Sequence, residues 1–251
     1  MKVYKRGEGE PEFTVTGSLH GDEPAGKKAI ERFLEEEHEF LKPVQFIVGN
    51  EKALEQDERY VDADLNRSFP GDEDSEEYEE RLAAEILELV KGTKLLDLHT
   101  TRSYPLPFST FSDLNDTTRD LLRSAGVKNA ALFPEESGTL NDFVEGVLVE
   151  TGFQGTDMAA MNALGVMKNF LAAQGVIDGS YRKSDPNVFR HTGTVDGDWE
   201  FLAENFKLVR EGEVYARKKG EKLRAEQDFY PILMSTNGYE GMLGFKAEKL
   251  E

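Results

Sequence analysis

The chain contains no cysteine, so neither a disulfide nor a thiolate metal site can form. Histidine is also scarce, with four residues in a chain of 251, and tryptophan occurs once. Any metal ion that this chain binds must therefore be held by His, Asp or Glu side chains. Each histidine has to be considered as a ligand.

Long apolar runs and an excess of basic residues are missing as well. No run reaches the roughly 20 apolar residues of a membrane span, and the start MKVYKRGEGEPEF lacks the apolar core of a signal peptide. We therefore expect a cytoplasmic protein without a membrane partner. The 49 Asp and Glu outnumber the 30 Lys and Arg, for a net charge of -19, which disfavours nucleic acid as a partner. Acid spread along the whole chain is typical of halophilic proteins, because salt screens the self-repulsion.

Strand patterns alternate with helical patterns through most of the chain. Alternation of this kind favours an α/β fold with a mixed, largely parallel sheet flanked by helices. The predicted strands are FTVTGSL, VQFIVGN, KLLDLHT and GVLVETG, and the predicted helices are PAGKKAIERFLEEEHEF, SEEYEERLAAEILELVKG, TRDLLRSAG and DMAAMNALGVMKNFLAAQG.

Past about residue 180 the alternation stops. Short strands and turns follow, as in FKLVREGEVYARKKGEKLR and DFYPILMSTNGYEGMLGF. We expect an α/β domain over residues 1–180 and a small β-rich subdomain over 181–251. The acidic segment GDEDSEEYEE, residues 71–80, is interpreted as a solvated loop that leads into a helix.

The segment TVTGSLHGDEPAG places His20 at the end of a predicted strand and Glu23 three residues later. Ligands of open α/β sheets bind outside the carboxyl ends of strands, and this pair can offer a nitrogen and an oxygen to zinc. The spacing alone is a weak pattern. Asp22 and Glu23 before Pro24 also suit an ordinary helix start, where acid complements the helix dipole.

A second histidine strengthens the metal hypothesis. KLLDLHTT is an apolar strand that ends in Asp97 and His99, at the same edge of a parallel sheet as His20. His20, Glu23 and His99 would leave one zinc position open, as catalytic zinc sites do. Asp97 either orients a ligand or caps the strand. The other two histidines are weaker candidates: His38 reads as a surface helix residue, and His191 lies in the C-terminal subdomain.

Two further segments carry polar residues suited to catalysis. RYVDADLNRSFPGD, residues 59–72, is a polar loop whose Arg59 and Arg67 can bind a carboxylate or an oxyanion. A surface ion-pair network is the simpler interpretation of this loop by itself. Glu150 closes the strand GVLVETGF, where burial would raise its pKa and suit it to general acid–base work, unless it emerges into solvent. Together the elements match the needs of metal-assisted amide hydrolysis.

The order of these motifs resembles the succinylglutamate desuccinylase/aspartoacylase family, zinc deacylases similar in fold to zinc carboxypeptidases. The resemblance runs through four segments in the family's order, namely HGDE, RYVDADLNRSFPG, DLHTT and VLVETG. It covers most of the first 155 residues. The later segment DFYPILMSTNGYEGMLGFKAEK resembles the family's C-terminal β segment.

The resemblance implies a role for each matching residue. One zinc ion per chain would be bound by His20, Glu23 and His99, and Glu150 would be the general base toward the attacking water. Arg59 would polarise the scissile carbonyl and stabilise the oxyanion. The substrate would be a small acylated amino acid. Asn66 and Arg67 would hold its α-carboxylate, and Tyr239 of the C-terminal segment would also contact it. Asp64 would orient His20.

One departure from the family pattern concerns substrate choice. Aspartoacylases carry another carboxylate-binding arginine about ten residues before the catalytic glutamate, whereas this chain reads SGTLNDF there. Arg102, just after DLHTT, is the candidate to replace it, since succinylglutamate desuccinylases have an arginine in a comparable segment. The departure weakens the expectation of N-acetylaspartate as substrate.

Three functions fit the sequence. A zinc-dependent amidohydrolase that removes an acyl group from an N-acyl amino acid is the leading one. A zinc carboxypeptidase acting on short peptides would use the same residues, and a binding protein could keep the fold without catalysis. Against the last, a binding protein has no need of Glu150 as a water activator. The sequence leaves the oligomeric state open, including a homo-oligomer.

Overall fold

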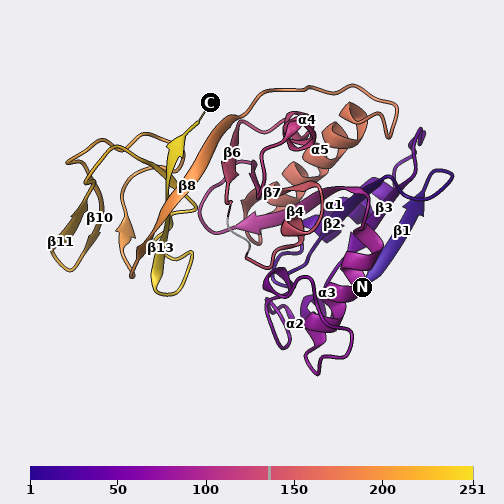
Figure 1. Cartoon of the computed structure of the whole chain (residues 1–251), viewed down its shortest axis with the longest axis horizontal. Coiled ribbons are helices and arrows are strands. Elements are labelled where there is room, and N and C mark those ends of the chain that lie inside the picture. The colour runs from indigo at the N-terminus through magenta and orange to yellow at the C-terminus, as the bar shows by residue number, and fades with distance from the viewer. Residues whose placement is uncertain (135–136, 251) are drawn as a thin grey trace.

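A ten-stranded mixed sheet runs through the chain in the computed structural model, which describes residues 1–134 and 137–250 (Figure 1). Its strand order is β1-β3-β2-β4-β7-β5-β6-β8-β13-β12. Five of the strand pairings in this sheet are parallel and four are antiparallel, which confirms the predicted α/β class with a mixed, largely parallel sheet. The strands of this sheet are β1 Lys2–Arg6, β2 Phe13–Gly17, β3 Val44–Val48, β4 Lys94–Thr101, β5 Phe108–Phe111, β6 Asn129–Leu132, β7 Gly146–Phe153, β8 Asn187–Asp196, β12 Tyr230–Ile232 and β13 Met242–Lys249.

Helices cover both faces of this sheet. Alternate residues of the buried strands point to opposite faces, so Leu96 and Leu98 pack with α1, α4 and α5 in one apolar cluster while Leu95 packs with α3 in another. Figure 1 shows α4 and α5 together on the side away from α3. The helices are α1 Ala25–Leu34, α2 Glu51–Gln56, α3 Tyr78–Val90, α4 Asp116–Ala125 and α5 Asp157–Ala173, with 3-10 turns η1 Leu65–Arg67 and η2 Leu140–Asp142.

The predicted first helix is too long. It was expected to reach Phe40, but α1 ends at Leu34, because the acids that follow, Glu35 to Glu37, are unfavourable at the negative end of a helix. His38 then folds back and stacks on Phe33, with ring centroids 4.0 Å apart, and its side chain is only 13% exposed. The interpretation of His38 as a surface helix residue is therefore wrong.

The C-terminal part forms a small antiparallel sheet of β9 Glu200–Phe201, β10 Val214–Lys218 and β11 Glu221–Arg224. β8 and β13 pair with each other and extend from the main sheet toward β10 and β11 (Figure 1). The strands past residue 180 therefore belong to both sheets. A domain boundary at that residue stays a prediction.

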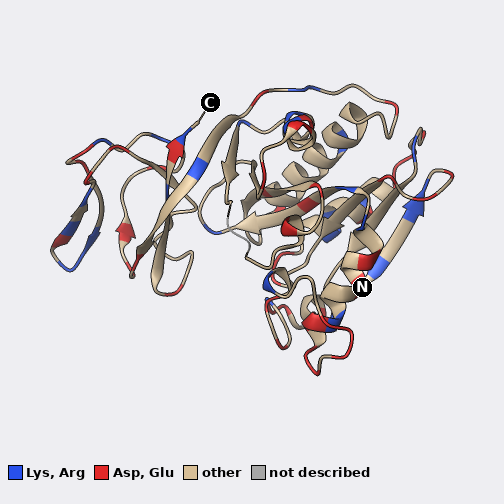
Figure 2. Ribbon diagram, viewed as in Figure 1, with Lys and Arg blue, Asp and Glu red and all other residues tan. Residues whose placement is uncertain are grey.

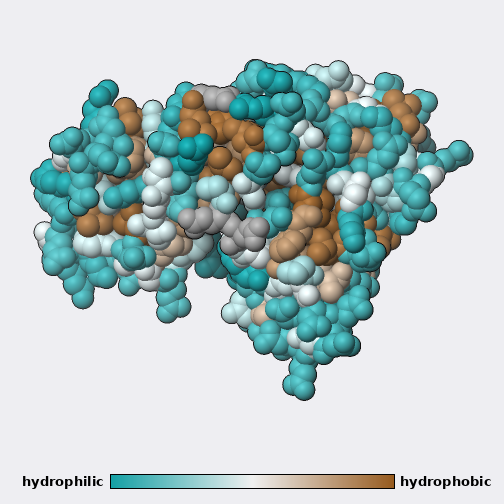
Figure 3. Space-filling model, viewed as in Figure 1, coloured by the Kyte–Doolittle hydropathy of each residue, from teal (hydrophilic) through white to brown (hydrophobic). Residues whose placement is uncertain are grey.

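Acidic residues outnumber basic ones and are spread along the chain. Figure 2 shows Asp and Glu distributed over loops and helices of the whole chain rather than in one cluster, and Figure 3 shows a largely hydrophilic face with separate apolar patches. Among the helices in residues 1–134 and 137–250, none is long and apolar enough to cross a membrane.

The parallel core of the sheet gathers strand ends at one edge. β2, β4 and β7 are neighbours and all parallel, with Gly17 opposite Leu98 and His99 opposite Glu150. The segments that leave the carboxyl ends of these strands therefore meet above the same edge, where open α/β sheets bind ligands.

Candidate metal centre and active site

Three buried side chains converge at this edge. His20 lies in the loop after β2, Glu23 lies just before α1, and His99 is in β4. One ligand atom from each lies within 4.8 Å of those of the other two. Two imidazoles and one carboxylate are a donor set that zinc accepts, so the structure brings together the three residues that the sequence suggested as ligands.

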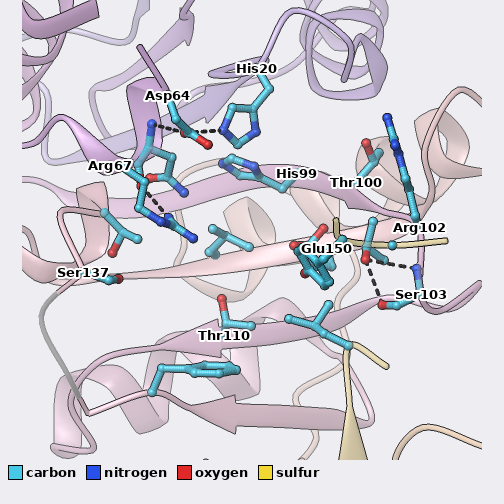
Figure 4. A pocket seen from close by; sticks show the side chains of 18 of the residues that line it. His20, Asp64, Arg67, His99, Thr100, Arg102, Ser103, Thr110, Ser137 and Glu150 are labelled. Carbon is cyan, nitrogen blue, oxygen red and sulfur yellow. Dashed lines mark hydrogen bonds and ion pairs between the residues drawn. The ribbon is translucent and has the colours of Figure 1, made fainter. Parts of the chain in front are cut away.

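The two imidazoles are oriented in the same way. Nδ1 of His20 lies 2.8 Å from Glu23 Oε1, and Nδ1 of His99 lies 3.3 Å from Glu23 Oε2. On the far side of each ring, Nε2 of His20 contacts Asp64 at 3.0 Å and Nε2 of His99 contacts Asp97 at 2.9 Å (Figure 4 draws the first). Carboxylates behind metal-binding histidines fix the ring and its tautomer, so both Nδ1 atoms are positioned to share one cation with Glu23.

Electrostatics in this site also favour a cation. Burial lowers the pKa of His99, but Asp97 and Glu23 more than offset this and raise it well above its usual value. Burial likewise raises the pKa of Glu23, yet His20 holds it well below its usual value. The carboxylates thus draw protons onto the imidazoles. A divalent cation can satisfy the same negative charge, with the imidazoles neutral.

Arg59 joins the loop after α2 to this centre. Its guanidinium donates to Asp64 Oδ2 from Nε at 3.0 Å and from Nη2 at 2.9 Å, and Nη1 lies 3.4 Å from Glu23 Oε1. The opposing effect of burial is overcome by His20 and Arg59, which lower the pKa of Asp64. Asp64 therefore stays ionised and links Arg59 to His20.

Glu150 lies on the floor of the pocket, opposite His99 in the β4–β7 register. Its Oε2 is shielded from water and has no hydrogen-bond partner within residues 1–134 and 137–250. Burial and the negative charge of Glu23 raise the pKa of Glu150 to about 7. A carboxylate with that pKa can both accept and return a proton near neutral pH.

The pocket has a volume of about 680 Å³ and contains every residue that the sequence suggested for substrate binding. Asn66 is buried, and its Oδ1 accepts from Leu140 N at 3.2 Å. Arg67 donates to Asn66 O and is otherwise exposed. Tyr239 is 40% exposed, and its pKa is raised by partial burial and by the negative charge of Glu150. Their roles stay predictions.

Arg102 lies on the other side of the pocket from Arg67 and Ser137 (Figure 4). Its Nε donates to Gln154 Oε1 at 2.6 Å, and its Nη2 lies 3.6 Å from Asp22 Oδ2. It therefore does not occupy the position of the arginine expected near residue 140. Substrate binding by Arg102 stays a prediction.

Gly21 is required by a close approach between two loops. Its N donates to Arg59 O at 3.1 Å, and a Cβ at this position would lie 2.1 Å from Ala53 C and 2.4 Å from Glu58 O. Only glycine allows the His20 loop to come so near the loop of Arg59. The glycine of HGDE thus holds the two halves of the centre together.

Glu79 is a residue that the sequence interpretation missed. It lies in the acidic segment read as a solvated loop, but it is 0% exposed. Oε1 accepts from Asn50 Nδ2 at 2.9 Å and Val61 N at 2.7 Å, and Oε2 accepts from Asp62 N at 2.9 Å and Ala63 N at 3.2 Å. The solvated-loop interpretation is wrong for this residue, because Glu79 holds the backbone between Arg59 and Asp64. Its place on the buried side of an amphipathic helix was the signal available in the sequence.

We expect Glu79→Gln to destabilise the fold by about 3 kcal/mol, because a side-chain NH₂ would then face a backbone N–H that now donates to the carboxylate. Chemical denaturation measures this change. The exposed Glu76→Gln is the matched control and should be neutral. An unchanged unfolding midpoint for Glu79→Gln would contradict the role given to it.

A sequence model of one family matches residues 10–153, which hold all four motifs of the centre. This model describes the succinylglutamate desuccinylase/aspartoacylase catalytic domain. The chain belongs to the succinylglutamate desuccinylase/aspartoacylase family. The predicted family resemblance is thereby confirmed.

Curated relatives within the family include two proteins described as probable aspartoacylases. The one from Prochlorococcus marinus is 33% identical over 100 residues, covering 35% of this chain and 33% of the relative. The one from Acaryochloris marina is 30% identical over 102 residues, covering 36% and 35%. The chain thus matches about a third of the length of these relatives.

Several solved structures share the fold along nearly the whole chain. Succinylglutamate desuccinylase/aspartoacylase from Rhodobacter sphaeroides superposes with a TM-score of 0.82 at 18% identity, covering 99% of this chain and 89% of the other. The ectoine utilization protein EutE (DoeB) from Ruegeria pomeroyi gives 0.79 at 19%, covering 98% and 87%. Murine aminoacylase 3 gives 0.74 at 19%, covering 98% and 97%. At these identities the likeness establishes the fold.

Proposed function

We propose that this chain is a zinc-dependent deacylase that hydrolyses the amide bond of an N-acyl amino acid or a similar small acylated amine. The observation that carries the proposal is the convergence of His20, Glu23 and His99 with Glu150 and Arg59 in one pocket. Family membership supports it, because the family's name describes deacylases.

The donor set fits zinc. Each Nδ1 atom lies next to one oxygen of the Glu23 carboxylate, ligand atoms of the three residues lie within 4.8 Å of one another, and Asp64 and Asp97 contact the far nitrogens of the rings. A zinc ion held by these residues would act as a Lewis acid toward the amide carbonyl and would acidify a water molecule.

The residues of the chain would handle the proton and the charge of the reaction. Glu150 would take the proton from the attacking water and pass it to the leaving nitrogen, for which a pKa of about 7 is suited. Arg59 would donate to the carbonyl oxygen as it becomes an oxyanion. Its bonds to Asp64 fix the direction of the guanidinium in advance.

Substrate orientation would come from the 3-10 turn after Arg59. Asn66 and Arg67 are the second and third residues of this turn and would bind the α-carboxylate, and Tyr239 would contact the substrate from the β12–β13 connection. The products would be a free amino acid and a small carboxylate.

A panel of N-acyl amino acids, N-acyl amines and short peptides tests the proposal. We expect release of free amino acid from N-acyl amino acids by zinc-loaded protein, loss of that release after removal of metal with a chelator, and recovery after zinc is restored. Cleavage of C-terminal residues from peptides alone would show a carboxypeptidase. Zinc binding without hydrolysis of any compound would show a binding protein.

A further inference from the structure

The pocket is larger than a small acetylated amino acid needs. At about 30 Å³ for each water-sized atom, a volume of about 680 Å³ holds roughly twenty non-hydrogen atoms. His20, Glu23 and His99 cluster together, Arg59 contacts Glu23, and Glu150 lies opposite His99 in the sheet, so these groups share one end of this space. The rest of the space has room for a further part of the substrate.

The other end lies along one face of the sheet. Leu148 of β7 pairs with Thr110 of β5, and Thr110 pairs with Ala131 of β6, which in turn pairs with Phe189 of β8. Side chains two residues apart share a face, so Phe133 and His191 follow on the same side as Leu148 and Thr110. From β7 to β8 the floor spans three strand spacings, about 14 Å.

Three rings form the far wall. Phe133 and His191 are stacked with centroids 5.3 Å apart, and Phe245 stands edge-on to them at 5.2 Å from Phe133 and 5.3 Å from His191. The Tyr239 ring, 6.3 Å from that of Phe245, continues this wall toward the catalytic end. All four line the pocket and are only partly buried, so their free faces can contact a ligand.

Three uncharged side chains, Ser137, Thr139 and Asn141, line the pocket in the segment where an arginine for a second carboxylate was expected. This segment packs against the proposed carboxylate-binding turn, since Leu140 N donates to Asn66 Oδ1 and Phe69 N donates to Gly138 O at 3.1 Å. An α-carboxylate on Arg67 would thus place the amino acid side chain against Ser137 to Asn141.

Among the described lining residues, the only lysines or arginines are Arg59, Arg67 and Arg102, and all three come from the segments that follow α2 and β4. Arg102 is on the opposite side from Ser137 and is engaged with Gln154 and Asp22. A carboxylate on the substrate's side chain would therefore enter the pocket without a cation, at a large cost in free energy.

We infer that the substrate is an N-acyl amino acid whose side chain is uncharged and aromatic or of similar apolar bulk, seated against Phe133, His191 and Phe245. The inference rests on the proposed function, because it takes the catalytic end as the place of the amide and the α-carboxylate. It makes the segment Ser137 to Asn141 and the three rings the determinants of specificity.

Kinetics with N-acetyl-L-phenylalanine, N-acetyl-L-asparagine, N-acetyl-L-aspartate and N-acetyl-L-alanine test the inference. We expect kcat/KM for the phenylalanine compound to exceed that for the aspartate compound by about 100-fold or more. Asparagine and aspartate compounds have the same shape, so a preference for the former isolates the charge. The preference should persist at high salt, where general repulsion by the acidic protein is screened.

Phe133→Ala should lower kcat/KM for the phenylalanine compound about tenfold more than it lowers kcat/KM for the alanine compound. Phe143→Ala is the matched control, since Phe143 is 43% exposed and does not line the pocket. Equal losses with both compounds would mean general damage and would overturn the role of Phe133.

Two failures are distinguishable. A best rate with N-acetyl-L-aspartate would overturn the inference and leave the deacylase proposal intact. Hydrolysis of none of these compounds, and of no member of the wider panel of N-acyl amino acids and amines, would overturn the deacylase proposal. In that event calorimetric binding of the same compounds to zinc-loaded protein decides the inference, which requires the phenylalanine compound to bind more tightly than the aspartate compound.

Discussion

Glu150→Gln is expected to lower kcat for N-acyl amino acid hydrolysis about 10³-fold while zinc content stays the same. The amide of glutamine has nearly the shape of the carboxylate but cannot accept the proton of the attacking water. Glu150 contributes no atom to the three-residue ligand cluster, so metal binding should persist. Steady-state kinetics, with elemental analysis of the same sample, measure both quantities.

The shape-conserving substitution separates catalysis from folding. Thermal unfolding of Glu150→Gln should match or exceed that of the unaltered protein, because a carboxylate shielded from water without a partner is replaced by a neutral group. If the variant kept more than a tenth of the original kcat, Glu150 would not be the general base and the proposed mechanism would fail.

Glu23→Gln is expected to weaken zinc binding by more than about 100-fold, the upper effect of losing a residue that only supports a ligand. Glu23 is the negatively charged member of the cluster, and its two oxygens face both imidazoles. A neutral amide would supply one weaker donor and would lose the ion pair with Arg59. Competition with a chelating dye measures the affinity.

Asp97→Asn provides the comparison for this prediction. Asp97 supports His99 from behind, since it contacts the far nitrogen of that ring and accepts from Thr16 Oγ1 at 2.6 Å. Its loss should weaken zinc binding by about 10- to 100-fold. Zinc affinity in Glu23→Gln equal to that of the unaltered protein would remove Glu23 from the ligand set. A larger effect of Asp97→Asn than of Glu23→Gln would reverse the assignment of ligand and support.

The sequence predicted the parts of this site that depend on local patterns. Strand ends are readable from apolar runs that stop, and the edge of a parallel sheet then brings His20, His99 and Glu150 near one another. α1, α3, α4 and α5 were predicted because their apolar residues recur at helical spacing, although α1 ends earlier than expected. The short helix α2 was not predicted.

The contacts that the sequence did not predict join segments far apart in the chain. Helical spacing places Glu79 on the buried side of α3, but no local pattern identifies its partners, the backbone N–H groups of residues 61–63. His191 was set aside as part of a C-terminal subdomain, yet β8 pairs with β6 in the main sheet and brings it into the pocket. Strand order beyond adjacent segments was the missing information.

A crystal structure of the zinc-loaded protein with a phosphonate analogue of an N-acyl amino acid tests the central claim most directly, because the tetrahedral phosphonate resembles the transition state. The account predicts zinc bonded to His20, Glu23 and His99, phosphonate oxygens facing Arg59 and Glu150, and the analogue's carboxylate on Asn66 and Arg67. Zinc held by another set of residues, or an analogue bound away from this pocket, would contradict it.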